Sequence, residues 1–193
     1  MDIHTQLFEG QIIRLAPIDH EKDPEVMARW SNDPEYLRMV SYEPARPQSV
    51  AVMKKKLEEI EKEVDESKNS YYFTIRTCAT DRLVGFARIS WIEWTHGSGH
   101  LSLGIGDAAD RWHGYGSEAL RLLLHYCFSE LNLYRLTATM PEYNTAALGL
   151  FQKFGFVEEV RRRQAIHRDG RRWDLLHLGL LREEWSETAG GAS

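Results

Sequence analysis

The sequence predicts a mixed α/β (α+β) fold in which a mostly antiparallel central sheet is flanked by helices. Three alternating segments, 71–78, 83–94 and 100–106, follow one another with short turns between them, which predicts antiparallel strands. Amphipathic helical segments lie before and after this group, and a hairpin pattern closes the chain. Because strands follow strands in the middle of the chain, the order is not a repeating βαβ array.

Length and composition favour one globular domain. The chain has 193 residues, of which 42% are hydrophobic and 27% charged, and no composition break or low-complexity linker marks a second domain. We therefore expect one domain over 1–186 and a frayed tail over 187–193. The two cysteines, Cys78 and Cys127, form no C-x-x-C pair. We expect both to be buried free thiols in a reducing, cytoplasmic compartment.

The charge balance and hydropathy exclude several classes of partner. A net charge of −5 argues against binding to a nucleic-acid backbone and is compatible with a cationic substrate. No apolar stretch approaches about 20 residues, and the N-terminus lacks a basic region followed by an apolar one. We therefore expect no membrane span, signal peptide or membrane partner. No metal site is expected, and a homodimer is compatible with the sequence.

The first third of the chain predicts one strand and two helices. Residues 11–15 alternate in the manner of a strand. The segment DPE at 23–25 marks a helix start, and SNDP at 31–34 ends that helix. Ser49 begins a second helix, whose apolar positions recur at helical spacing through Val64. Its charged face is predicted to be a solvated surface.

The last third predicts two more helices, one strand and a hairpin. The longer helix carries an apolar stripe, and the shorter one is stopped by a glycine in the position of a C-cap. The predicted elements are a helix over 117–131, a strand over 134–140, a helix over 145–154, and hairpin strands over 158–166 and 172–181.

Residues 110–119 (DRWHGYGSEA) connect the third middle strand to the helix predicted over 117–131. Gly114 and Gly116 allow the backbone to approach a bulky group at the start of that helix. The free N–H groups of the first turn and the helix dipole favour an anion there, and pyrophosphate is a frequent ligand of such a site.

The same glycines also fit the dinucleotide fingerprint G-x-G-x-x-[GA]. That fingerprint requires parallel strands on both sides and an acidic residue about 20 residues further on. Here the following strand ends at Met140-Pro141 before any carboxylate. A nicotinamide or flavin nucleotide is therefore disfavoured.

A second motif identifies a family. Asn144 opens a helix that ends in Gly155-Phe156, which gives N-x-x-A-x-x-x-F-x-K-x-G-F. Together with Arg111-x-x-Gly114-x-Gly116, this pattern resembles the GNAT superfamily of acetyl-coenzyme A (acetyl-CoA)-dependent N-acetyltransferases. Further details resemble its RimJ/RimL-type branch, which holds ribosomal-protein N-terminal and spermidine acetyltransferases. They are WSND at 30–33, GSEAL at 116–120, F-x-x-L-x-L at 128–133 and EEW at 183–185.

The resemblance implies an acyl-CoA N-acyltransferase fold in which strands four and five, here 100–106 and 134–140, splay apart. The pantetheine arm of acetyl-CoA would lie between them, and amides of residues 112–117 would hold the pyrophosphate. The residues implied to bind the cofactor are Gly104, Ile105, Gly106, Arg111, Trp112, His113, Gly114, Tyr115, Gly116, Ser117, Asn144, Phe151 and Lys153.

Three of these residues also have a simpler interpretation. Arg111 could be a surface charge beside Asp110, and Lys153 a solvated side chain. Asn144 could serve only as the N-cap of its helix, a role that Asn favours. Both roles of Asn144 can coexist.

The resemblance also implies a general base on strand four, and His100 occupies the position where many family members have Glu. An imidazole with an ordinary pKa near ~6.5 suits this role. His100 could also be a strand histidine with an ordinary hydrogen bond. Glu93, at the end of the preceding strand, is the competing carboxylate.

The usual general acids of the family are absent. The Tyr found seven residues after the motif Asn is Phe151 here, and the Ser found three residues after it is Ala147. Tyr143 and Ser102 are the remaining hydroxyl candidates. Alternatively, no acid is needed, because a thiol with a pKa of about 8.5 is a tolerable leaving group.

The implied activity is acetyl transfer from acetyl-CoA to a primary amine by direct attack in a ternary complex. A protein N-terminal amine is favoured, followed by a polyamine or small-molecule amine. The alternatives are a non-catalytic acyl-CoA-binding module and a transferase that uses another acyl-CoA. An acceptor cleft with aromatic walls and a carboxylate would suit a cation. The candidate lining residues are Trp30, Tyr36, Trp91, Glu93, Trp94 and His96.

Overall fold

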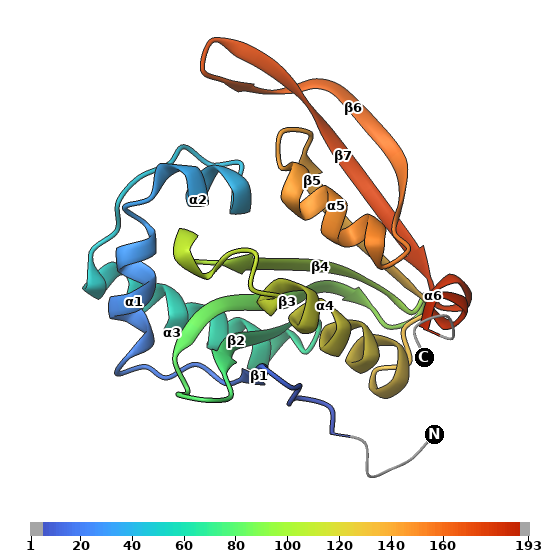
Figure 1. The fold of residues 1–193 in the computed structure, drawn as a ribbon, viewed down its shortest axis with the longest axis horizontal. Helices are drawn as coiled ribbons and strands as arrows, with labels where there is room; N and C mark the ends of the chain where they lie inside the picture. The colour runs from blue at the N-terminus through green and yellow to red at the C-terminus, as the bar shows by residue number, and fades with distance from the viewer. Residues whose placement is uncertain (1–5, 190–193) are drawn as a thin grey trace.

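The computed structural model describes residues 6–189, with side chains through Trp185, and this part of the chain contains one seven-stranded sheet (Figure 1). The strand order is β1-β2-β3-β4-β5-β7-β6, and within it only the β4–β5 pair is parallel. The strands are β1 (Ile13–Ala16), β2 (Tyr71–Thr77), β3 (Leu83–Glu93), β4 (Ser98–Ile105), β5 (Arg135–Pro141), β6 (Val157–Arg168) and β7 (Arg171–Leu181). The prediction of a mixed, mostly antiparallel sheet is confirmed.

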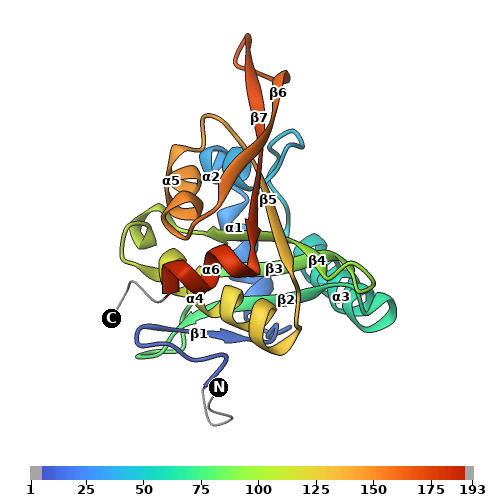
Figure 2. The ribbon, with the colours of Figure 1, turned by 90° about the vertical axis from the view of Figure 1, so that its right-hand side faces the viewer.

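Helices cover both faces of the sheet, and Figure 2 shows α3 and α4 on opposite sides of it. The helices are α1 (Asp23–Trp30), α2 (Pro34–Val40), α3 (Val50–Ser67), α4 (Tyr115–His125), α5 (Thr145–Lys153) and α6 (Arg182–Ala189). A π-helical turn, Tyr126–Glu130, continues α4. The apolar stripe of α4 is buried in the main core at Leu120, Leu123 and Leu124. Burial of each Leu stabilises the fold by about 1.5–3 kcal/mol.

A second, smaller core lies beneath α1, α2 and α3. Met27 and Trp30 of α1 meet Tyr36 of α2, Leu57 of α3 and Leu83 of β3. The Trp30 and Tyr36 rings meet edge to face, with centroids 5.9 Å apart. This core holds α2 in place over one end of the sheet.

The helix α2 is absent from the sequence prediction, which treats residues 31–34 only as a helix stop. Asp33 is the N-cap of α2, and its carboxylate accepts hydrogen bonds from the Glu35 and Tyr36 amides at 2.9 and 3.2 Å. Pro34 occupies the first turn, where its missing N–H costs nothing. The same Asp-Pro pair therefore ends one helix and begins the next.

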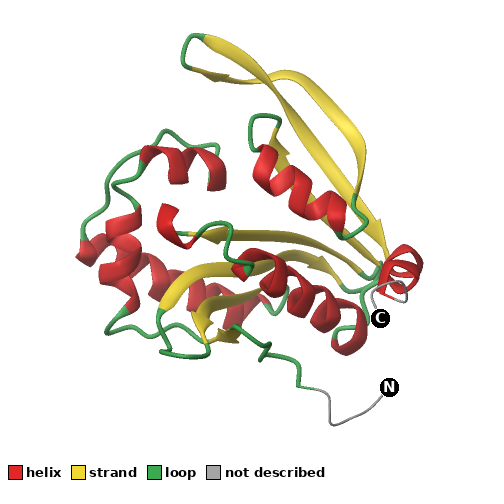
Figure 3. Cartoon of the chain, viewed as in Figure 1, coloured by secondary structure: helices red, strands yellow, loops and turns green. Residues whose placement is uncertain are grey.

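Other element bounds also differ from the prediction. The strand β4 begins at Ser98, so the turn before it is shorter than expected. The helix α6 runs to Ala189, which includes the first residues of the tail expected to fray from residue 187, and the rest of that tail, 190–193, lies outside the described residues. Figure 3 shows α6 directly after β7 and the β6–β7 hairpin projecting beyond the rest of the sheet. Cys127 is buried as expected, whereas Cys78 is exposed, which corrects that expectation.

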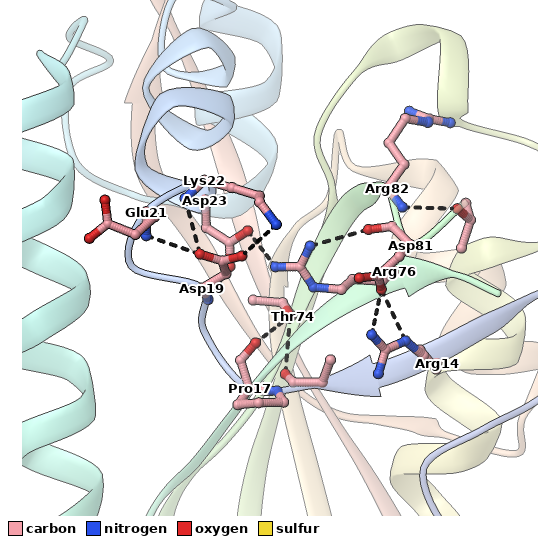
Figure 4. Close-up of polar contacts among 12 residues, drawn as sticks. Arg14, Pro17, Asp19, Glu21, Lys22, Asp23, Thr74, Arg76, Asp81 and Arg82 are labelled. Atoms are coloured by element: carbon pink, nitrogen blue, oxygen red, sulfur yellow. Dashed lines mark hydrogen bonds and ion pairs between the residues drawn. The ribbon is translucent and has the colours of Figure 1, made fainter. Parts of the chain in front are cut away.

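A buried ion pair fastens α1 to the sheet (Figure 4). The Arg76 guanidinium on β2 donates to the Asp23 carboxylate at 2.5 Å, and both side chains are almost fully buried. Asp23 also accepts from the Asp19 amide at 2.7 Å. Removal of either charge would leave the other one desolvated and unpaired.

We expect the substitution Asp23→Ala to lower the free energy of unfolding by about 3 kcal/mol or more, because it leaves the Arg76 charge buried without its partner. Chemical denaturation with urea measures this loss. The neighbouring Arg14–Asp81 pair at 2.5 Å is solvent-exposed and provides the control. Arg14→Gln should cost less than about 1 kcal/mol. Equal losses in the two variants would contradict the role of burial.

Candidate active site

The sheet opens between its two parallel strands. Residues 98–101 of β4 pair with 135–138 of β5, and the ladder stops at Leu101 and Ala138. β4 nevertheless continues to Ile105 and β5 to Pro141. The two strands therefore present unpaired edges to each other beyond residue 101, as the predicted splay requires.

The register with β3 decides which groups of β4 face this opening. The Gly106 amide donates to the Val84 carbonyl of the β3 side at 2.9 Å, and Gly104 is the partner of Phe86. Backbone groups alternate between the two edges of a strand. Gly104 and Gly106 therefore direct their N–H and C=O groups toward β3, whereas Leu103 and Ile105 direct theirs into the opening.

The N-terminus of α4 carries free backbone donors. Gly114 is the N-cap, and its φ of +85° lies in the left-handed region that favours glycine. The Glu118 amide closes the first turn on the Gly114 carbonyl at 3.0 Å. Within the described residues, the Tyr115, Gly116 and Ser117 amides have no acceptor. Three N–H groups at a helix start form a site for an anion.

The carboxylate of Glu118 does not oppose an anion at this position. It accepts hydrogen bonds from the amides of Gln11, Ile12 and Ile13 at 2.7, 2.8 and 2.9 Å, which ties α4 to the start of β1. Partial burial acts to raise the pKa of Glu118, but the three backbone donors lower it below the ordinary value.

Gly116 lies where the start of α4 approaches the open edge of β4. A Cβ at this position would lie 3.5 Å from Leu150 of α5 and 3.8 and 3.9 Å from Ile105 and Leu103 of β4. These are ordinary contacts, so a methyl group would fit. A longer side chain would project among the residues that border the opening.

Arg111 bridges two segments instead of standing free. Its guanidinium donates to Asp33 and to the Gly106 carbonyl, both at 3.2 Å, and also lies 3.5 Å from Glu35. Asp110, the partner considered from the sequence, instead binds Arg82 through two hydrogen bonds of 2.6 and 2.7 Å. Arg111 thus joins the loop before α4 to the N-terminus of α2.

The other residues of the glycine motif and the following helix differ in exposure. Trp112 is 87% exposed, with a positive φ, and His113 binds the Arg111 carbonyl through Nδ1 at 2.9 Å. Lys153 is exposed and has no ion pair among the residues whose side chains are described. Phe151 is buried in the main core against Phe156, so its ring has almost no surface left for a ligand.

Tyr143 and Asn144 connect the start of α5 to the end of α2. The Tyr143 hydroxyl donates to the Arg38 carbonyl at 3.0 Å, and burial raises its pKa. Asn144 caps α5 by accepting from the Ala147 amide and donates to the Met39 carbonyl, both at 3.2 Å. The N-cap interpretation of Asn144 is confirmed.

His100 lies on β4 just before the opening, and its ring is held by the adjacent strand. Its Nδ1 lies 3.1 Å from the Thr137 hydroxyl, which itself donates to the Gly99 carbonyl at 3.3 Å. With its hydroxyl hydrogen directed at Gly99, the Thr137 oxygen is available to accept from Nδ1–H in the tautomer that is protonated at Nδ1. This arrangement leaves Nε2 of His100 with its lone pair. Burial lowers the pKa of His100, and the charge of His177 lowers it further.

Three residues on the strands that follow β4 in the sheet, Thr137, Thr139 and His177, do not stand out in the sequence. His177 of β7 faces the Thr139 hydroxyl of β5 through Nδ1 at 3.2 Å, and its buried Nε2 has no partner in the described part of the chain. Thr137 pairs with His100, and Thr139 with His177, across strand neighbours far apart in sequence. Only the sheet order brings these residues together, so no local sequence signal could have revealed them.

The residues proposed for an acceptor cleft fall into two separate cavities. Trp30 and Tyr36 line a cavity of about 750 Å³ between α1, α2, α3 and the sheet. Trp91, Glu93 and His96 line another, of about 680 Å³, together with His100. Trp94 lines neither, and its indole N–H donates to the Lys68 carbonyl at 3.0 Å.

A β-bulge places Trp91 beside His100. The β3–β4 register shifts between Ser90 and Glu93, and Trp91 has a φ of +52° there. Its ring centroid lies 5.1 Å from that of His100, while the indole is 72% exposed. Glu93 accepts from the Ser98 hydroxyl at 2.8 Å. The carboxylate of Glu93 therefore already has a partner within its own turn.

Gly106 is required by packing against α1. A Cβ at this position would lie 2.0 Å from the Trp30 ring. We expect Gly106→Ala to lower the free energy of unfolding by about 1–3 kcal/mol, because the ring must move in a filled core. Urea denaturation measures the loss, and Trp30→Leu should relieve most of it in the double variant. Identical losses in both backgrounds would contradict this explanation.

The sequence model of a family described as "Acetyltransferase (GNAT) domain" matches residues 13–157. This match covers more than half of the chain, so the chain belongs to the GNAT acetyltransferase family, and the sheet opened between β4 and β5 agrees with an acyltransferase fold. It is an acetyl-CoA-dependent N-acetyltransferase.

Individual relatives agree with this assignment. The chain is 25% identical over 166 residues to "Uncharacterized N-acetyltransferase p20" of Bacillus licheniformis, which covers 86% of this chain and 90% of the relative. It is 32% identical over 79 residues to "Putative ribosomal N-acetyltransferase YdaF" of Bacillus subtilis, covering 40% and 43%. The fold is similar to that of a spermidine N-acetyltransferase from Vibrio cholerae in complex with CoA and spermine. That similarity has a TM-score of 0.76 at 20% identity and covers 90% of this chain and 98% of that one.

Two other kinds of feature are absent from the part of the chain that the structure describes. No group of three or more His, Cys, Asp or Glu side chains in this part is placed to hold a metal ion. None of its helices combines the length and the hydrophobicity that a membrane crossing requires.

Proposed function

We propose that this protein acetylates a primary amine with His100 as the general base. The observation that carries the proposal is the position of His100, which lies at the end of the β4–β5 ladder with its Nδ1 held by Thr137. Its lowered pKa keeps the imidazole neutral at pH 7, as a base must be. Glu93 is the weaker candidate, because its carboxylate is bound to Ser98.

The site fits acetyl-CoA. The free amides of Tyr115, Gly116 and Ser117 would hold the pyrophosphate, and the edge of β4 at Leu103 and Ile105 would pair with the pantetheine amides. Acetyl-CoA supplies an acetyl group activated as a thioester. Gly104 and Gly106 contribute space and strand geometry in this arrangement, since their own backbone groups face β3.

Different residues on and near this edge of β4 would act as the base, the oxyanion donor and the acid. Nε2 of His100 takes the proton of the acceptor ammonium, either directly or through a water molecule. The Leu103 amide is the first donor beyond the ladder and would polarise the thioester carbonyl. The Tyr143 hydroxyl donates a hydrogen bond to the Arg38 backbone carbonyl, so it is a weak candidate for the acid. Ser102 lies two residues from His100 on the same face of β4 and is the other hydroxyl candidate for the acid.

Two acceptor classes have support. The partial match to a putative ribosomal N-acetyltransferase favours a protein N-terminal amine, in line with the RimJ/RimL-type motifs. The fold similarity to a spermidine N-acetyltransferase supports a polyamine or small-molecule amine. We place the N-terminal amine first, because its support comes from the sequence match and the sequence motifs, whereas the polyamine is supported by fold similarity alone.

A thiol-release assay with acetyl-CoA and a panel of N-terminal peptides, polyamines and small amines tests this function. Amine-dependent release of free CoA is the expected result. Stabilisation by acetyl-CoA in a thermal-shift measurement without release from any amine would favour the non-catalytic binding module. Faster release of free CoA from a longer acyl-CoA than from acetyl-CoA would favour a transferase that uses another acyl-CoA.

A further inference from the structure

The ladder between β4 and β5 breaks at one particular hydrogen bond. In a parallel pair, every second residue of a strand donates its N–H to the neighbouring strand and accepts through its C=O from the residue two positions further along that strand. The Arg135 amide donates to the Gly97 carbonyl, so Arg135 and every second residue after it, including Thr139, direct their backbone groups toward β4. In a continuous ladder the Leu103 amide would donate to the Thr139 carbonyl. The pairing ends just before this bond.

A side chain from outside the sheet binds the carbonyl at this break. The Tyr42 hydroxyl donates to the Thr139 carbonyl at 3.0 Å, in place of the Leu103 amide. Tyr42 belongs to the segment that follows α2, and Figure 1 shows the end of that helix turned toward α5 and the β6–β7 hairpin. The Tyr42 hydroxyl and the Leu103 amide therefore lie on opposite sides of the opening, at the point where the two strands separate.

The backbone on both sides of Tyr42 is held by the β6–β7 hairpin. The Arg168 guanidinium donates to the carbonyls of Ser41 and Glu43 at 2.9 and 3.1 Å. Two hydrogen bonds from the start of α5 hold the end of α2 beside this segment. The Tyr42 side chain is 51% exposed. These polar contacts, and not burial in a core, therefore direct the phenol to the opening.

We infer that Tyr42 donates a hydrogen bond to the sulfur of acetyl-CoA and stabilises the thiolate as it leaves. This inference rests on the proposed function, in which the Leu103 amide polarises the thioester carbonyl. When the carbon–sulfur bond breaks, its electron pair passes to the sulfur, and the Tyr42 hydroxyl turns from the Thr139 carbonyl to this charge. Solvent then supplies the proton that makes free CoA, while His100 releases to solvent the proton that it took from the amine.

The phenol of Tyr42 suits a hydrogen bond better than a proton transfer. Partial burial and the nearby Tyr143 hydroxyl raise the pKa of Tyr42 to about 12, against the opposing charge of Arg162. A thiol has a pKa of about 8.5. Tyr42 therefore keeps its proton and stabilises the thiolate as a donor. This role is compatible with Ala147 and Phe151 at the positions of the usual acids of the family.

The pKa of the CoA thiol in the complex tests this inference without turnover. A hydrogen bond to the thiolate lowers that pKa. We expect the thiol to ionise about 1–2 pH units lower in the wild-type complex than in the complex of Tyr42→Phe, which keeps the ring and loses the hydroxyl. Ultraviolet absorbance of the thiolate measures the ionisation, and the complex with desulfo-CoA, which lacks the sulfur, is the blank. Equal thiol pKa values in the two complexes would overturn the inference.

Other charged or titratable groups near this point are present in both complexes, so the difference isolates the Tyr42 hydroxyl. They are Arg162 and Arg168 of the hairpin, Tyr143 before α5, His100 of β4 and His177 of β7.

The two remaining hydroxyl candidates provide the comparison. Tyr143→Phe also removes a phenol hydroxyl that donates to a backbone carbonyl at 3.0 Å, but that carbonyl is on Arg38 of α2. Ser102→Ala removes a hydroxyl that lines the larger cavity. Both variants should keep the wild-type thiol pKa in the complex. If either raises it as much as Tyr42→Phe does, the assignment to Tyr42 is wrong.

Turnover separates this inference from the proposed function. In the thiol-release assay, Tyr42→Phe should lower kcat about 10–10²-fold and leave the dissociation constant of acetyl-CoA within about threefold of the wild-type value. Full activity of Tyr42→Phe would overturn the inference and leave the acetyltransferase function intact. If no amine releases thiol, the proposed function fails, whereas a thiol pKa that depends on Tyr42 still supports the contact with sulfur. Absence of CoA binding would overturn both.

Discussion

Replacing His100 with Gln is expected to lower kcat for amine-dependent thiol release by about 10²–10³-fold, because the site loses its proton acceptor. The amide preserves a hydrogen bond to Thr137 and much of the side-chain volume, so the strand register should remain. Thermal-shift affinity for acetyl-CoA should stay within about threefold of that of the wild type. Loss of both activity and cofactor binding would instead indicate a structural role.

The pH dependence of the reaction provides a sharper test of the same residue. Because burial and the charge of His177 lower the pKa of His100 from its ordinary value of 6.5, wild-type kcat/KM should fall only as the pH decreases below 6.5. This fall in kcat/KM at low pH is the acidic limb of the profile. His177→Gln removes one of the two causes of the lowered pKa, so the acidic limb should move to higher pH. In His100→Gln, the residual activity should show no acidic limb. Glu93→Gln should leave the limb in place, and its loss in that variant would transfer the role of base to Glu93.

The second large effect is expected from Gly116→Leu, which should weaken acetyl-CoA binding by about 10²-fold or more. The new side chain would project among Leu103, Ile105 and Leu150, where the start of α4 meets the opening of the sheet. Displacement of the pyrophosphate from two charge-assisted amide hydrogen bonds, each contributing about 1.5–3 kcal/mol, accounts for this magnitude. Isothermal titration with CoA measures the change.

Gly149 offers a matched control within the same region. It lies on α5, and a Cβ added there would meet no atom within 4 Å. Gly149→Leu should therefore leave the dissociation constant of CoA unchanged. Gly116→Ala should have a much smaller effect than Gly116→Leu, because its methyl group makes only ordinary contacts. Undiminished CoA binding by Gly116→Leu would place the pyrophosphate elsewhere.

Local sequence patterns predicted most of the strands and the helices α1, α3, α4 and α5 close to their observed bounds. Their signals are short-range, since alternation, helical periodicity and caps depend on residues within a few positions of each other. The helix α2 was not predicted, because Asp33-Pro34 can both end one helix and begin the next. The segment after Pro34 is helical because Tyr36 packs against Trp30, a tertiary contact.

Partnerships of charged and polar side chains were much harder to predict. Arg111 is adjacent to Asp110 in sequence but binds Asp33, whereas Asp110 binds Arg82. Tyr143 was a candidate acid, yet its hydroxyl donates a hydrogen bond to the Arg38 carbonyl. In each case the partner comes from an element distant in sequence, so spacing along the chain carries no information about it.

By itself, the sequence determined the α/β class, the glycine turn at the start of α4, the motif around Asn144, and hence the acetyltransferase family. These features depend on residue types at short, regular spacings. Only the tertiary structure decided that Leu103 and Ile105 face the opening, that Thr137 of β5 contacts Nδ1 of His100, and that Arg111 joins the loop before α4 to the N-terminus of α2. The physical reason is that strand register and sheet order determine which distant residues meet.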